Sequence, residues 1–272
     1  MQPPLRARHA RFLLAALAAA GLTVAGCGSD DEAASTTAAP TTSAAAAATT
    51  PAGSTPAAGV ASDDYCDAAM AINTAGTAAG DPDEDPAAFA TQLIGPAKAA
   101  AALAPAAISA AYATAIPAMQ AAIDGDSSKF GDIDQAGAQI DEFNAANCPW
   151  TKVPVTLANY HFVGLPETLD AGDYTFELDN TGTESHLLLI ITKKPGVTES
   201  FEELLASPEG ESKVDTVVAG FAPPGGQAKT SGHLDPGDYL VLCPISVGST
   251  GQTEGTGPPH FTMGMQQALT VS

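Results

Sequence analysis

The hydrophobic pattern of the chain changes at Thr151, and this change limits which fold each part can adopt. After Thr151, apolar residues alternate with polar ones. Alternation with a period of two is typical of β-strands that bury one face. The alternating residues are Val153, Val155 and Leu157, then Tyr174, Phe176 and Leu178, then Leu188, Ile190 and Thr192, with turn sequences at 169–173, 180–182 and 234–238. We therefore predict an all-β sandwich over residues 151–272, interrupted by a short helix from Glu199 to Ala206.

Residues 63–150 precede the predicted sandwich and have a different composition. They are rich in alanine, and their larger apolar residues recur at helical spacing, as in Ile108, Tyr112, Ile116 and Met119. Such spacing buries one face of a helix. The pattern predicts a small α-helical bundle of three or four helices, one beginning at Asp85 or Pro86 and the last covering about 127–147. Proline removes a helical hydrogen bond, so Pro96 and Pro117 are expected to kink or interrupt their helices.

The N-terminal residues carry the features of an export signal. Three arginines precede a short apolar run, Phe12 to Ala25, and a bilayer-spanning helix needs about 20 apolar residues. A retained transmembrane helix is the alternative. The segment Thr23–Cys27 resembles the lipobox of bacterial lipoproteins. This resemblance implies cleavage after residue 26 and acylation of Cys27, whereas the alternative is an ordinary signal peptide with an incidental cysteine.

Residues 28–62 consist mostly of alanine, threonine, serine, proline and glycine, which predicts a disordered linker. The predicted organisation is a signal peptide at 1–26, an acylated Cys27 with its linker at 27–62, a helical domain at 63–150 and the sandwich at 151–272. An acyl chain on Cys27 would anchor the protein to a lipid bilayer that it does not span. We expect it on the outer face of the bacterial cytoplasmic membrane.

The four cysteines can be assigned almost completely. With Cys27 given to lipid, Cys66 and Cys148 bracket the helical block and are expected to form a disulfide in an oxidising compartment. The block resembles the cysteine-clamped helical segments of exported bacterial lipoproteins. Cys243 is left over. It is either a buried free thiol that packs as a small apolar side chain or a metal ligand.

The charge of the chain argues against nucleic acid as a partner. Removing the three leader arginines from ten basic residues leaves seven lysines against 31 acidic residues, a formal net charge of −24. Phosphate binding requires clustered lysine and arginine. A strongly acidic surface is compatible with cationic partners or metal ions, or it serves solubility alone.

The stretch 238–265 places three soft metal ligands on one strand, loop and strand unit. They are the Cys243 thiol, the His260 imidazole and the Met265 thioether. Two histidines, one cysteine and a distant methionine form the ligand set of blue-copper electron-transfer sites. The required second histidine is available at His186.

Three segments resemble the copper-binding segments of cupredoxins of the plastocyanin and azurin type. FELDNTGTESH ends in asparagine, a Thr-Gly turn and a histidine, and GDYLVLC ends in a cysteine. PHFTMGM contains Pro-His, three residues and Gly-Met. The resemblance implies a Greek-key cupredoxin sandwich with one type 1 copper site. By this resemblance His186, Cys243 and His260 are the trigonal ligands and Met265 is the weak axial ligand.

The chain departs from the cupredoxin pattern between Cys243 and His260, where 16 residues replace the usual few. Lengthening a flexible loop to this extent costs about 2 kcal/mol by the logarithmic closure term. The insertion weakens the copper prediction without excluding it. It could cover the site, bind a partner, or remain after metal binding was lost. Met263 is the poorer axial candidate, because the Gly-Met pair of the family falls at Met265.

Two functions are compatible with these patterns. The first is a lipid-anchored cupredoxin that carries single electrons or handles copper, with a redox or copper-donor protein as partner. The second is a metal-free cupredoxin fold used for binding or adhesion. An enzyme is not predicted, because the sequence lacks nucleophile-elbow, zinc-protease, dithiol and P-loop motifs. A second copper site would need further histidines, and His161 and His233 match no cupredoxin segment.

Overall fold

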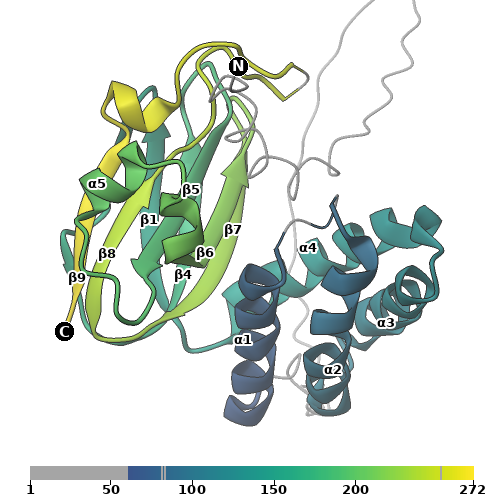
Figure 1. Cartoon of the computed structure of the whole chain (residues 1–272). Helices are drawn as coiled ribbons and strands as arrows, with labels where there is room; N and C mark the ends of the chain where they lie inside the picture. Colours follow the sequence, from purple (N-terminus) through teal and green to yellow (C-terminus); the bar gives the residue numbers. More distant parts are fainter. Residues whose placement is uncertain (1–60, 81, 83, 252) are drawn as a thin grey trace, which may run out of the picture.

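The computed structural model describes residues 61–80, 82, 84–251 and 253–272. The predicted signal peptide at 1–26, the acylation of Cys27 and nearly all of the linker at 27–62 fall outside these residues. Figure 1 shows a helical region beside a two-sheet sandwich. Among the helices of the described chain, none is both long enough and apolar enough to cross a bilayer.

The helical region of the described chain contains four α-helices and one short 3-10 helix. They are α1 (Asp63–Ala78), α2 (Pro86–Leu103), α3 (Ser109–Ile123), η3 (Ser127–Lys129) and α4 (Phe130–Asn147). Polar side chains cap two of the helices: Ser62 accepts a hydrogen bond from the N–H of Tyr65, and Asp85 accepts one from the N–H of Ala88. The prediction of three or four helices, one beginning at Pro86, is confirmed.

Of the predicted kink or interruption at Pro96 and Pro117, the interruption does not occur. Both prolines lie inside helices, α2 and α3, that continue past them. A proline inside a helix costs about 3 kcal/mol in isolation. The packing of α2 and α3 against their neighbours outweighs this cost, since the residues that follow the two prolines, Ala97 and Ala118, are buried in the helical core.

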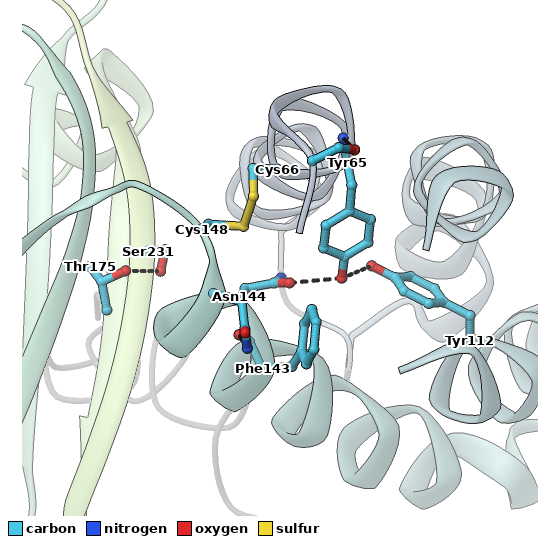
Figure 2. The surroundings of a disulfide bond; sticks show 10 residues. Tyr65, Cys66, Tyr112, Phe143, Asn144, Cys148, Thr175 and Ser231 are labelled. Carbon is cyan, nitrogen blue, oxygen red and sulfur yellow. Dashed lines mark hydrogen bonds between the residues drawn. A yellow bond between two sulfur atoms is a disulfide. The ribbon is translucent and has the colours of Figure 1, made fainter. Parts of the chain in front are cut away.

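A disulfide joins the first and last helices of this region (Figure 2). Cys66 of α1 is bonded to Cys148, the residue that ends α4, which confirms the predicted pairing. Beside it, the hydroxyl of Tyr65 donates a hydrogen bond of 2.7 Å to Asn144 Oδ1 and lies 3.1 Å from the hydroxyl of Tyr112. These buried contacts connect α1, α3 and α4 and supplement a core made largely of alanine.

The sandwich consists of two mixed sheets with strand orders β2-β1-β4-β7 and β3-β9-β8-β5-β6. β1 pairs with β4 and β3 with β9 in parallel, and the other neighbours are antiparallel. The strands are β1 (Thr151–Ala158), β2 (His161–Val163), β3 (Thr168–Leu169), β4 (Gly172–Asn180), β5 (His186–Lys193), β6 (Val214–Ala222), β7 (Gln227–Leu234), β8 (Gly237–Leu242) and β9 (Gln266–Val271). The predicted class, a disulfide-bonded helical region followed by a β-sandwich, is confirmed.

Two connections of the sandwich contain further helices. The predicted short helix is α5 (Phe201–Ala206), followed by the 3-10 helix η4 (Gly210–Lys213), and another 3-10 helix, η5 (His260–Met263), precedes β9. α5 begins two residues later than predicted. Ser200 ends the extended segment and forms a capping box with Glu203, so the helix can begin only after Ser200.

Strand β5 differs from the predicted alternation because both of its faces are buried. Leu188 and Ile190 are buried within the sandwich core. Leu187 and Leu189 are also buried, and they line a cavity shared with the helical region. The helices therefore cover an outer face of the sandwich that would otherwise be exposed, through contacts of α1 with β6 and β7 and of α4 with β7.

Asp141 of α4 makes the stability of the protein depend on pH. Burial raises the pKa of its carboxyl group from 3.8 to about 7. Between about pH 4 and 7, the folded state therefore keeps a proton that the unfolded state has released, so Asp141 lowers the free energy of unfolding as the pH rises through this window.

We expect Asp141→Asn to stabilise the protein at pH 8 relative to wild type by an amount on the order of 2 kcal/mol, and to have little effect at pH 4.5. Urea unfolding of both proteins at the two pH values measures the difference. Asp132→Asn, at an exposed position on the same helix, is the matched control and should show no such pH-dependent gain. An equal effect of Asp141→Asn at both pH values would contradict the prediction.

Candidate metal centre

The predicted ligands come from three separate elements that end at the same edge of the sandwich. His186 is the first residue of β5, Cys243 follows the last residue of β8, and His260 is the first residue of η5. β5 pairs with β8, with Leu189 opposite Leu242, so the cysteine that follows β8 lies near the start of β5. The N–H of Leu187 donates a hydrogen bond of 3.3 Å to the Cys243 sulfur.

The three side chains converge closely enough to hold one metal ion. Nδ1 of His186 lies 3.1 Å from Nδ1 of His260, which in turn lies 3.4 Å from Sγ of Cys243. The three potential ligand atoms lie within 4.8 Å of one another, and all three residues are fully buried. Nitrogen and sulfur ligands bound to one ion at about 2.0–2.3 Å are separated by roughly 3.1–3.7 Å. The residues present therefore fit a metal ion by their spacing and by their chemistry.

The protonation states of the ligands also suit metal binding. Burial lowers the pKa of His186 to about 4, and the nearby His260 contributes to this shift. Burial likewise lowers the pKa of His260, and Glu184 partly opposes this effect. Both imidazoles are therefore neutral at pH 7 and present a lone pair. Burial raises the pKa of Cys243 to about 12, so metal ligation must displace the thiol proton.

Two residues outside the ligand set orient the imidazoles. Nε2 of His260 lies 2.9 Å from Oε2 of Glu184, and Nε2 of His186 lies 3.4 Å from Oδ1 of Asn159. When each Nε2 donates its proton to these oxygens, each Nδ1 is left free to bind a metal. Sequence reasoning missed both residues. Glu184 precedes His186 by two positions, but nothing in that local pattern indicates that it contacts His260.

The turn that precedes His186 is held by Asn180. Its side-chain amide donates to the carbonyl oxygens of Glu184, Ala222 and Pro223, and its Oδ1 accepts from the N–H of Gly182. A Cβ atom at Gly182 would lie only 2.7 Å from Nε2 of His186. The Asn and Gly of the cupredoxin-like segment thus have a physical role here: they let the turn pack directly on the histidine.

The long loop between Cys243 and His260 does not separate these two residues. At its base, the N–H of His260 donates to the carbonyl of Ile245, and the N–H of Phe261 donates to the carbonyl of Cys243. Further along, Ser246 and Pro259 form an antiparallel bridge, so the two arms run together away from the site. The carboxylate of Glu184 also accepts a hydrogen bond of 2.6 Å from the N–H of Gly248. One acidic side chain therefore contacts both the loop and a ligand.

Met265 and Met263 have different surroundings. Met265 is fully buried, its N–H donates to the carbonyl of His260, and its carbonyl accepts from the N–H of Cys243. Met263 is 50 % exposed. Gly264 between them has a φ of 110°, a left-handed conformation that favours glycine and turns the chain so that Met265 points inward. This difference in burial favours Met265 over Met263 as the axial candidate.

The remaining histidines of the described chain lie away from the cluster. His161 is exposed on β2, and its Nδ1 lies 3.1 Å from the carbonyl of Asn159. His233 on β7 pairs with Asp173 at 2.6 Å and with Asp235 at 3.4 Å. Within the parts of the chain that the structure describes, one group of three or more His, Cys, Asp or Glu side chains is close enough to hold an ion, and it consists of His186, Cys243 and His260.

We expect Glu184→Gln to weaken copper binding by about 10- to 100-fold, because the amide cannot hold the Nε2 proton of His260 as strongly as the carboxylate does. Competition with a chelator of known affinity measures the change. Glu177→Gln, on β4, removes the same charge from a residue that has no contact with the cluster and is the matched control. Equal copper affinity in Glu184→Gln and wild type would show that Glu184 does not position His260.

Among known proteins, similarity to this chain was found only with solved structures. No protein-family description matches the sequence, and no curated protein does. The chain is similar to reduced auracyanin from Roseiflexus castenholzii (18 % identity, 45 % of this chain and 97 % of that one, TM-score 0.32). It is also similar to auracyanin A, a "blue" copper protein from Chloroflexus aurantiacus (17 %, 44 % and 99 %, 0.29), and to a multicopper oxidase from Pediococcus acidilactici (11 %, 46 % and 27 %, 0.27).

Proposed function

We propose that the cupredoxin-like sandwich binds one copper ion and transfers single electrons at the cell envelope. The observation that carries this proposal is the fully buried cluster of His186, Cys243 and His260, in which Nδ1 of His260 already lies at ligand-to-ligand distance from the other two ligand atoms. Two histidines and one cysteine with a weak axial methionine form a type 1 copper site. In this proposal the axial ligand is Met265.

Hydrogen bonds hold the three candidate ligands in place, so a bound metal ion could gain or lose one electron with little movement of the side chains. The two imidazoles are fixed by Glu184 and Asn159, and the Cys243 sulfur accepts a hydrogen bond from the N–H of Leu187. The surrounding core excludes water. A bound copper ion would supply the one-electron couple, whose potential depends on the axial ligand and on hydrogen bonding around the sulfur. We propose no catalytic turnover, because a single ion site of this kind suits electron transfer.

Export and anchoring are proposals that rest on the N-terminal sequence. The apolar run from Phe12 to Ala25 and the lipobox-like segment that ends at Cys27 support cleavage after residue 26 and acylation. The linker at 27–62 would separate the described region from the lipid surface. The protein would then meet a redox or copper-donor partner outside the cytoplasmic membrane.

Cys27→Ser should move the protein from the membrane fraction to the soluble fraction after cell lysis, whereas unchanged partitioning would contradict acylation at this residue.

Voltammetry of the copper-loaded protein tests electron transfer directly. The proposal predicts one reversible one-electron wave that is absent without copper and in His260→Ala. A protein that takes up copper but shows no reversible wave, and that passes the metal to a chelator instead, would have a copper-handling function. A protein that binds no copper would be the metal-free binding module.

A further inference from the structure

A cavity lies where the helical region meets the sandwich, and we call it the interface cavity. Its volume is about 590 Å³, and it is lined by side chains of α1 to α4 together with side chains of β5, β6 and β7. This volume is within the range of small-molecule sites, about 300–1,000 Å³. Apolar residues make up most of its wall, among them Ile72, Leu93, Ile140, Leu187 and Leu189.

The charged residues of the wall all carry the same sign. Glu84, Asp141 and Glu211 line the interface cavity, and no lysine, arginine or histidine of the described chain does so. The nearby Lys229 of β7 forms its ion pair with Glu142, at 2.8 Å, outside the wall. The potential inside the cavity is therefore negative and favours a cationic occupant.

Asp141 lacks a partner for its carboxylate. Among the described residues, no side chain or backbone group donates a hydrogen bond to it, although the residue is half-buried in the cavity wall. The hydroxyl of Tyr65, which lies on the facing helix, is already used by Asn144 and Tyr112 (Figure 2). A partly desolvated carboxylate without a partner is unfavourable, and its raised pKa reflects the same cost. A bound cationic group would remove this cost.

The residues of the wall also indicate whether the cavity suits a metal ion or an organic cation. Ca²⁺ requires six to eight oxygen ligands and Mg²⁺ needs octahedral coordination with several waters. The three carboxylates of the wall, those of Glu84, Asp141 and Glu211, do not provide such a set, because among the described residues they do not come close enough together to hold one ion. Three aromatic rings, those of Phe89, Tyr112 and Phe221, line the same cavity. Aromatic faces attract organic ammonium groups, and the apolar wall can bury a hydrocarbon body.

We propose that the interface cavity binds a small, largely apolar organic cation whose ammonium group pairs with Asp141. The occupant would bridge the helical region and the sandwich, since residues of both form the wall. This assigns a ligand-binding role to the helical region and is independent of the copper site.

Three probes of the same shape test the proposal on the chain from residue 28 onward. They are 4-phenylbutylamine, 4-phenylbutan-1-ol and 4-phenylbutyrate, which are cationic, neutral and anionic, and isothermal titration at pH 8 measures their affinities. We expect the amine to bind at least about tenfold more tightly than the alcohol, as a charged hydrogen bond predicts, and the carboxylate to bind most weakly. Equal affinities for amine and alcohol, or binding of none of the probes, would overturn the proposal.

Two variants locate the site. Asp141→Asn should reduce amine affinity to that of the alcohol and leave alcohol binding unchanged, whereas Asp132→Asn on the same helix should change neither. Gly137→Leu should abolish binding of all three probes, because Gly137 lines the cavity and a Cβ atom there meets nothing within 4 Å, so the larger side chain enters the cavity without a clash at its base. An amine that still binds Asp141→Asn more tightly than the alcohol does, or any probe that still binds Gly137→Leu, would refute the proposed site. Copper content measured on the same samples should be unaffected, which separates this test from that of the metal centre.

Discussion

The Cys243→Ser protein is expected to lose the intense visible absorption of a copper–thiolate site and to bind copper at least about 100-fold more weakly than wild type. Cys243 is the one sulfur donor in the His186, Cys243 and His260 cluster, and copper affinity and colour both depend on the thiolate. Serine has nearly the same shape, and its oxygen can accept the hydrogen bond that the N–H of Leu187 now donates to sulfur. We therefore expect the variant to fold.

Visible spectroscopy and copper competition on purified protein measure this effect. His161→Ala is the matched control, because His161 is exposed on β2 and contacts no member of the cluster. Circular dichroism should show the same strand content in all three proteins. A Cys243→Ser protein that keeps the wild-type colour would show that another residue supplies the sulfur or that the band has a different origin.

Removal of the Cys66–Cys148 disulfide is expected to lower the free energy of unfolding of the helical region by about 4.5 kcal/mol in the chain-entropy model. The bond closes a loop of 82 residues and joins the two ends of a region whose core is mostly alanine. Alanine buries little apolar surface, so few other contacts can compensate for the loss.

The double variant Cys66→Ala with Cys148→Ala tests this by urea unfolding followed at a helix-sensitive wavelength, with the reduced wild type as a second measurement. The visible spectrum of the copper-loaded protein should remain unchanged, because both cysteines lie in the helical region. A change in the free energy of unfolding below about 1 kcal/mol would show that the packing of α1 against α4 holds the region without the bond.

The elements of this fold were predictable where their cause is local. Alternation in β1 and β4 follows directly from the pleat of a strand, and Asp85 marks the beginning of α2 by its capping bond. The burial of both faces of β5 was not predictable, because it depends on where the helical region packs. The continuation of α2 through Pro96 has the same kind of cause, since tertiary packing outweighs a local penalty.

In the candidate site, too, some residues could be predicted from local sequence and others could not. His186, Cys243 and His260 stand out because their residue types and local contexts suit copper, and the structure brings them together. Glu184 and Asn159 do not stand out, because each acts through a histidine far away in sequence or across a turn. The sequence of the long loop between Cys243 and His260 did not predict its conformation, because that conformation depends on backbone hydrogen bonds between the two arms of the loop.

The central claim is that one copper ion binds at His186, Cys243 and His260. The most direct measurement is the copper content and visible spectrum of the chain from residue 28 onward after loading with Cu(II) and removal of excess metal. The proposed site predicts one copper per chain and a strong thiolate-to-copper band. A colourless protein that retains no copper would contradict the claim.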